Sequence, residues 1–170
     1  NVERVNMQGG SIRCYVQKEA GSRQVSSNVR TFVDYEYNNG FTDLEYLTRF
    51  QKRIDYKKTR LLELVKSLKA DGQKVAGYGA PTKSTTLLSY FEITGEYLDY
   101  IIDDNPLKQN KFTPQTHIPV VDNEILNTDE QPDYLLILAW NFAESIIESI
   151  RSRGRFRGKF IIPLPDVKVQ

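Results

Sequence analysis

A glycine turn followed by a lysine stands in the middle of the chain. Residues 76–91 read AGYGAPTKSTTLLSYF, with Gly77, Gly79, Pro81 and Lys83 ahead of an apolar, helix-like segment. Backbone N–H groups at the start of a helix bind phosphate groups, and a lysine adds a point charge. In a first helical turn the helix dipole disfavours a cation unless an anion is bound there. The turn therefore predicts an anion site; the alternative is an ordinary strand-to-helix turn with a solvated lysine.

Three ligand templates fit this turn incompletely. A nucleotide-triphosphate P-loop needs a glycine where Thr82 precedes the lysine. A dinucleotide turn, G-x-G-x-x-G/A, matches at Gly77 and Gly79 but again meets Thr82, and Asp103 or Asp104 would then hold the ribose. A class I methyltransferase site for S-adenosylmethionine uses the same kinds of residue. Spacing alone leaves this choice open.

The elements that position the turn follow from the hydrophobic pattern. Apolar residues recur at helical intervals from residue 42 to residue 71, which predicts one long amphipathic helix ended by Gly72. Short apolar runs then alternate with helical segments, and YLLILA at 134–139 is typical of a parallel strand buried on both faces. We predict an α/β fold with a doubly wound, mainly parallel five-stranded sheet and flanking helices. The long helix precedes it, and alternating residues at 11–17 predict an amino-terminal strand.

Composition excludes several classes of function. The chain has 23 basic and 22 acidic residues, so no overall field recruits nucleic acid or an anionic membrane. Cys14 and His117 are the only cysteine and the only histidine, so a Cys/His metal site and a disulfide framework are not expected. No apolar run approaches the roughly 20 residues that span a bilayer. We expect a cytoplasmic protein without a membrane partner, and we interpret the start NVERVNMQGG as part of a longer chain.

Five blocks of sequence together resemble one family. In chain order they are QGGSIRCYV (8–16), GYGAPTKSTTLL (77–88), IIDDNPLKQNKFTPQTHIPV (101–120), PDYLLILAWNF (132–142) and GKFIIPLP (158–165). This series resembles the carboxyl-terminal domain of the nucleotide-sugar C-methyltransferases and covers nearly the whole chain. The resemblance implies a Rossmann-like domain at 41–170. Residues 1–40 would be a strand and linker from a missing upstream methyltransferase domain.

The resemblance also implies a function. In that family a cysteine-rich zinc module and an S-adenosylmethionine-binding domain precede this part, and the methyl group goes to the sugar carbon beside a 4-keto group. The chain would help to bind and position the nucleotide-diphosphate sugar for the covalently linked upstream domain. S-adenosylmethionine would be bound by that upstream domain and no cofactor by this fragment, which we expect to be inactive alone. The rival hypothesis is a non-catalytic regulatory or scaffolding module that binds NAD or another nucleotide.

Two residues depart from the family pattern. Gln8 stands where the family has histidine in its His-Gly-Gly-Ser segment, which removes a proton-transfer or sugar contact. Gln115 stands where the family has glycine in Pro-Gly-Thr-His. Because glutamine tolerates positive φ poorly, we expect this second change to alter the loop turn.

Seven residues are the candidate substrate-binding set. Tyr78, Gly79 and Lys83 would bind the diphosphate through backbone amides and a point charge. Asn105 and Lys108 would reach the same anion from the turn after the second strand. The alternative is an ordinary Asx turn at Asn105 with a surface lysine. The last two candidates, which follow the strand at 134–139, are Trp140 and Asn141.

The remaining expectations concern single residues. Trp140 would stack on a base or sugar, or else pack in the core, and Asn141 would cap the next helix. His117 is the one candidate for proton transfer, although a structural role is the commoner use of a lone loop histidine. The strand at 11–17, without an upstream sheet, would have an open edge that invites homodimerisation.

Overall fold

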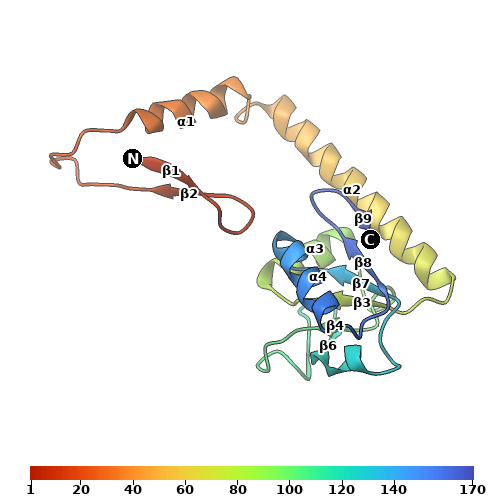
Figure 1. Cartoon of the computed structure of the whole chain (residues 1–170). Coiled ribbons are helices and arrows are strands. Elements are labelled where there is room, and N and C mark those ends of the chain that lie inside the picture. The colour runs from red at the N-terminus through yellow and green to blue at the C-terminus, as the bar shows by residue number, and fades with distance from the viewer. The chain divides into compact units, whose positions relative to one another are not determined.

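A computed structural model describes all residues from 1 to 170 (Figure 1). It divides into two compact units, Asn1–Ile54 and Asp55–Gln170. The domain border that we expect after residue 40 stays a prediction. None of the helices is both long enough and apolar enough to cross a membrane.

The first unit is a hairpin and helices with very little core. Strands β1 (Val2–Val5) and β2 (Ser11–Cys14) pair antiparallel, and helix α1 covers Ser27–Asn38. The Ser26 side chain caps α1 by accepting a hydrogen bond from the Asn28 amide at 3.2 Å. Val2 is the one buried hydrophobic residue of this unit. The sequence predicted the second strand but neither β1 nor α1.

Helix α2 (Leu44–Ala70) connects the two units, and it confirms the long helix predicted at 42–71. Gly72 ends it with φ of 73°, while the amide of Gln73 donates to Leu68. A left-handed residue at this position is the usual end of a helix, and glycine adopts it without a steric penalty. The helix stop was therefore predicted correctly.

The second unit contains a seven-stranded sheet in the order β5-β6-β4-β3-β7-β8-β9. The five central strands are parallel, whereas β5 and β9 pair antiparallel at the two edges. The α/β class and the mainly parallel sheet are confirmed, but the expected number of five strands was wrong. Both additional strands are only two residues long, too short to leave a pattern in the sequence. The strands are β3 (Val75–Tyr78), β4 (Ile101–Ile102), β5 (Lys111–Phe112), β6 (Pro119–Val121), β7 (Tyr134–Ile137), β8 (Lys159–Ile162) and β9 (Lys168–Val169).

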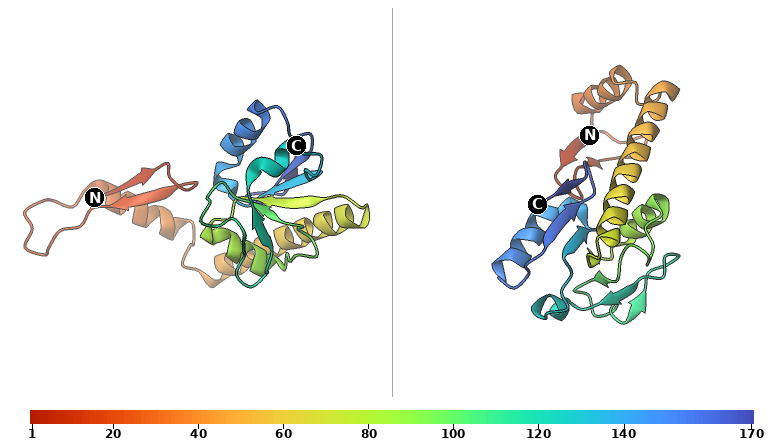
Figure 2. Two further views of the ribbon diagram at one scale, coloured as in Figure 1. Left: turned by 90° about the horizontal axis from the view of Figure 1, so that it is seen from below. Right: turned by 90° about the vertical axis from the view of Figure 1, so that its right-hand side faces the viewer.

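Helices cover both faces of this sheet (Figure 2). On one face, α4 (Ala143–Ser152) packs Ile147 and Ile150 into a buried cluster with alternate residues of β3 and β7. On the other face lie α3 (Thr82–Phe91) and the second half of α2. Packing is close in the central strand, since a Cβ on Gly77 would lie 2.8 Å from Leu138 Cδ1. Two 3₁₀ turns, Asn123–Asn127 and Trp140–Phe142, complete the unit.

The strand order determines where a ligand can enter. Chain connections leave β3 toward β4 and β6 on one side, and the chain then returns to β7 and β8 on the other side. Ligands of open α/β sheets bind beyond the carboxyl ends of the strands at the point where the order reverses. That point lies between the ends of β3 and β7, and the glycine turn stands there.

Candidate functional site

Hydrogen bonds join the glycine turn to the end of the neighbouring strand β4. Gly79 has φ of 86°, and its amide donates to the Ile102 carbonyl at 2.7 Å. The next amide, that of Ala80, donates to Asp103 Oδ2 at 2.6 Å. A Cβ on Gly79 would lie 3.1 Å from the Ala139 Cβ, so glycine lets the turn approach the end of β7. A phosphate would therefore meet the amides that follow, in the first turn of α3.

Asp103 connects the glycine turn to the loop after β4. Besides Ala80, its buried carboxylate accepts hydrogen bonds from the Asn105 amide at 2.9 Å and from Lys108 Nζ at 3.1 Å. Burial raises the pKa of the Asp103 carboxyl, but these three hydrogen bonds outweigh it, so the net pKa lies below its ordinary value. The carboxylate thus stays charged and holds the two loops together.

Tyr78 lies beneath the turn rather than on its surface. Its side chain is buried in the cluster that includes Ala143 and Ile147, and its hydroxyl donates to Asp104 Oδ2 at 3.1 Å. Burial, together with the nearby Asp104 carboxylate, raises the pKa of Tyr78 to about 12. Asp104 also accepts from Asn123 Nδ2 at 2.7 Å. Both acids that could hold a ribose are therefore engaged by protein groups.

The first turn of α3 opens onto a cavity of about 290 Å³. Pro81 occupies the N-cap position and provides no capping hydrogen bond, and the first turn contains no acidic residue. The positive end of the helix is therefore not neutralised by the helix itself. Two lysines line the same cavity, Lys108 and Lys111, and Phe112 adds an aromatic ring that is 56% exposed. Lys111 and Phe112 lie within the block at 101–120, but sequence reasoning did not select them, because nothing in that block assigns either residue a chemical role.

The loop that bears these side chains has an unusual backbone. Asn110, Gln115 and His117 have φ of 59°, 65° and 53°. Gln115 adopts the left-handed region, which glutamine tolerates poorly, and the expectation that it alters the turn stays a prediction. Its Oε1 accepts a hydrogen bond from Ser89 Oγ at 2.5 Å. The His117 ring stacks on Phe112 with a centroid distance of 4.5 Å and an interplanar angle of 6°.

A second group of candidate residues surrounds Lys83. Its Nζ lies 5.2 Å from the ring centroid of Trp140 and 5.8 Å from that of Phe142, within the range of cation–π attraction. Asn141 lies between these two aromatic residues in a 3₁₀ turn, and all three line another cavity of about 430 Å³. Phe142, not Asn141, stands at the N-cap position of α4, so the predicted cap was wrong. The 3₁₀ turn moves the start of the helix beyond Asn141.

The candidate residues therefore form two groups at the carboxyl ends of the parallel strands. Asn105 and Lys108 belong with Asp103 at the end of β4, whereas Lys83, Trp140 and Asn141 gather at the end of β7. Gly79 and Tyr78 form the turn between them. This arrangement combines cations, aromatic faces and an uncapped helix start, which suits a ligand with both a phosphate group and a flat ring.

Comparison with known proteins identifies the family. The sequence profile described as the C-methyltransferase C-terminal domain matches residues 6–165. This chain belongs to that family. It is also 32% identical over 169 residues to the C-methyltransferase NovU of Streptomyces niveus. The match covers 99% of this chain but 40% of NovU, so the chain spans less than half the length of this relative.

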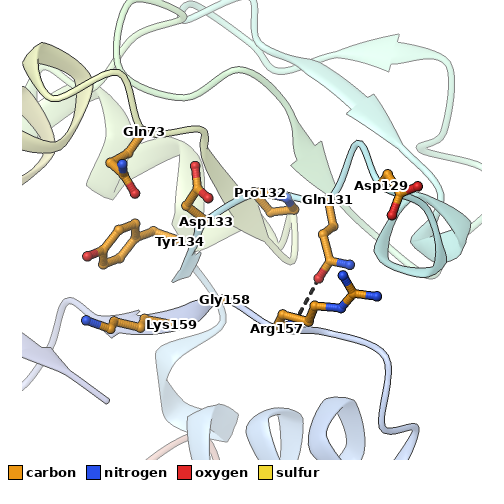
Figure 3. A pocket seen from close by; sticks show the side chains of 9 residues that line it. All are labelled: Gln73, Asp129, Gln131, Pro132, Asp133, Tyr134, Arg157, Gly158 and Lys159. Atoms are coloured by element: carbon orange, nitrogen blue, oxygen red, sulfur yellow. Dashed lines mark hydrogen bonds between the residues drawn. The ribbon is translucent and has the colours of Figure 1, made fainter.

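Another cavity in this C-methyltransferase C-terminal domain, of about 370 Å³, lies at the amino-terminal ends of the strands (Figure 3). Tyr134 and Lys159, the first residues of β7 and β8, line it. Gln131 Oε1 accepts a hydrogen bond from the Arg157 amide at 2.8 Å within its wall. Ligands of such sheets bind at the carboxyl ends of the strands, so this cavity is not the candidate site. Its residues can instead provide control variants.

The domain has no cluster suited to a metal ion. No three His, Cys, Asp or Glu side chains lie close enough together to hold one. The acids at the carboxyl edge instead bond to amides, to a tyrosine hydroxyl and to a lysine. The site can bind and orient a ligand, and its lysines and helix start favour an anion.

Proposed function

We propose that this domain binds the nucleotide diphosphate of a 4-keto sugar and holds the sugar for methylation by another part of a longer C-methyltransferase. Family membership and the name of NovU support C-methylation as the reaction of the whole protein. The observation that carries the proposal is the cavity at the start of α3, with Lys108, Lys111 and Phe112 in its wall. Its contribution to the rate is position, because an oriented sugar reacts more readily than a freely tumbling one.

The chemistry of the cavity fits a nucleotide diphosphate. The uncapped first turn of α3 offers amides and the positive end of the helix dipole to a phosphate. Lys108 and Lys111 add positive charge beside it, and the exposed ring of Phe112 offers a face for a base. Lys83, in the first turn of α3, would add a charged contact to the diphosphate, and Trp140 would contact the remaining part of the ligand.

The hydrogen bonds at the glycine turn weigh against binding of S-adenosylmethionine by this domain. Such a site needs an acid at the end of the second strand that is free to take the ribose hydroxyls. Asp103 bonds instead to Ala80, Asn105 and Lys108, and Asp104 bonds to Tyr78 and Asn123. On this proposal the methyl donor is bound by the covalently linked upstream domain. On this proposal the isolated chain is inactive, and the domain is Rossmann-like in its strand order.

A binding titration of this chain tests the proposal. Deoxythymidine diphosphate and uridine diphosphate are titrated separately by calorimetry, with NAD in a third experiment. We expect one of the diphosphates to bind and Lys83→Ala to weaken its affinity about tenfold, the usual loss for one charged contact to phosphate. Lys159→Ala, in the cavity at the amino-terminal ends of the strands, is the matched control and should leave the affinity unchanged. Unchanged affinity of the Lys83→Ala variant would refute the assignment.

The rival function is a non-catalytic module that binds NAD for regulation or scaffolding. The strand order and the two glycines of the turn favour it, because both recur in dinucleotide-binding sheets. The engagement of Asp103 weighs against it, since no acid is then available for the adenosine ribose. Binding of NAD without binding of either diphosphate would establish this rival in place of the proposal.

A further inference from the structure

The cavity at the start of α3 has two walls that are distant in the sequence. One wall is the first turn of α3, which includes Thr85. The other belongs to the β5–β6 loop (residues 112–118) and includes Phe112, Thr113 and Pro114. A ligand that fills the cavity would touch both walls. The position of this loop relative to the helix therefore determines how closely the ligand is held.

Hydrogen bonds within the β5–β6 loop make it a compact unit. Thr113 is buried, its Oγ1 lies 2.8 Å from Thr116 Oγ1, and the same atom accepts a hydrogen bond from the Ile118 amide at 2.8 Å. The amide of His117 donates to the Thr113 carbonyl at 3.1 Å, and the His117 ring stacks on Phe112. The loop should therefore move as one body, so a single contact at its tip can fix the position of the Phe112 ring as well.

Gln115 makes such a contact at the tip of the β5–β6 loop. Its Oε1 accepts the hydrogen bond from Ser89 Oγ at 2.5 Å. Gln115 directly follows Pro114 of the loop wall, and Ser89 lies four residues beyond Thr85 of the helix wall. Residues four apart are neighbours on the surface of a helix. The hydrogen bond therefore joins the two walls just outside the cavity.

The backbone of Gln115 needs support to keep this position. Its φ of 65° lies in the left-handed region, where a residue with a Cβ persists only if the surrounding structure holds it. Core packing does not supply the support, because Gln115 is exposed. The hydrogen bond from Ser89 does contribute to it. Strained residues of this kind gather at ligand clamps, where they keep a wall of the site in place.

We infer that Gln115 is a positioning residue of the candidate site, whose hydrogen bond to Ser89 slows the departure of a bound nucleotide diphosphate. The inference rests on the proposed function, because the ligand is the one proposed there. Without the hydrogen bond, the β5–β6 loop would spend part of the time away from α3, and the Phe112 ring would leave the ligand with it. The helix start and the lysines alone would then hold the ligand for a shorter time.

Dissociation rates of matched variants test the inference. Phosphorus-31 NMR line shapes give the rate at which deoxythymidine diphosphate, and in a second series uridine diphosphate, leaves the 170-residue chain. Ser89→Ala removes the donor, and Gln115→Gly removes the acceptor while glycine adopts φ of 65° without strain. We expect each variant to raise the dissociation rate about fivefold, the usual effect of one hydrogen bond. Ser89→Thr keeps the hydroxyl and should retain the wild-type rate.

The double variant shows whether the two side chains act as a pair. Because they share one hydrogen bond, Ser89→Ala combined with Gln115→Gly should release the ligand no faster than either single variant. Ser152→Ala removes a hydroxyl that donates to Ser149 within α4, and it should leave the rate unchanged. The variants at 89 and 115 change no charge, so the ratio of their rates to the wild-type rate should stay constant as salt is raised. For Lys111→Ala that ratio should fall, because salt screens its charge.

Two results would overturn the inference and leave the proposed function standing. Unchanged dissociation rates in both single variants would mean that other contacts hold the loop. Increases that multiply in the double variant would mean that Ser89 and Gln115 act separately. If the wild-type chain binds neither diphosphate, the proposed function fails and this inference fails with it.

Discussion

The two halves of α2 carry the same apolar stripe and bury it to very different extents. In the first half Leu44, Leu47 and Phe50 are 79%, 49% and 48% exposed. In the second half Leu61 and Val65 are fully buried beneath the sheet. The difference shows that the spacing of apolar residues predicts which face of a helix is apolar. It does not predict whether other residues of this chain cover that face.

Truncation of matched leucines is the strongest test of this difference. Leu61→Ala should lower the free energy of unfolding by about 3 kcal/mol, because it leaves a cavity in the core of the second unit. Leu47→Ala, on the same helix, should cost less than about 0.5 kcal/mol in this chain. Urea unfolding followed by circular dichroism measures both. Equal losses would mean that the first half of the stripe is also covered.

The end of the second half offers a smaller test. Gly72 has φ of 73°, and a Cβ there would contact nothing within 4 Å, so only backbone strain opposes a side chain. Gly72→Ala should destabilise the second unit by about 1 kcal/mol. Gly72→Asn should cost less, because asparagine visits the left-handed region more readily. A Tm of the alanine variant equal to that of the wild type would show that the helix end can shift.

Two ion pairs of the second half of α2 should make the stability of the second unit depend on pH. This is the smallest expected effect. Lys58 lies 2.6 Å from Glu92 and Lys57 lies 2.5 Å from Asp166. Each lysine lowers the pKa of its carboxyl partner below the ordinary value. A lowered pKa in the folded state adds stability above the unfolded pKa of about 4, and this stability is lost as the pH falls through the folded value.

The corresponding experiment is a series of Tm measurements from pH 7 to pH 2. The double variant Glu92→Gln with Asp166→Asn should melt slightly below the wild type at pH 7, and the two curves should converge in acid. Glu45→Gln, which removes the Arg49 pair of the first half, is the control and should leave the Tm of the second unit unchanged. Curves that stay separate at low pH would exclude these ion pairs as the cause.

Much of the fold was predictable from local patterns. The long helix was predicted at 42–71 and occurs at Leu44–Ala70, and the run at 134–139 contains the buried strand β7. Helix α1 was not predicted, since none of its residues is buried and its aromatic and β-branched residues favour helix weakly. The edge strands β5 and β9 depend on their neighbours and not on their own two residues.

The site was predictable only as a location. The sequence placed Lys83, Lys108 and Trp140 in segments that follow three predicted strands, and these segments lie together at the carboxyl ends of the strands. The pairing of side chains was not predictable, because it depends on the path of the loop after β4. Asn110, Gln115 and His117 take left-handed conformations there that no rule for these residue types would require.

Asp103 has a consequence for the speed of binding. Its carboxylate joins the glycine turn to the loop after β4 through protein groups alone, so on the proposed function these loops need not become ordered as the ligand arrives. Association should therefore involve one kinetic step, with a rate set by diffusion and by attraction to the lysines, and it should slow as salt screens them. On the proposed function, such a domain would bind the substrate without rearranging, and movement during turnover would fall to the parts of the protein around it.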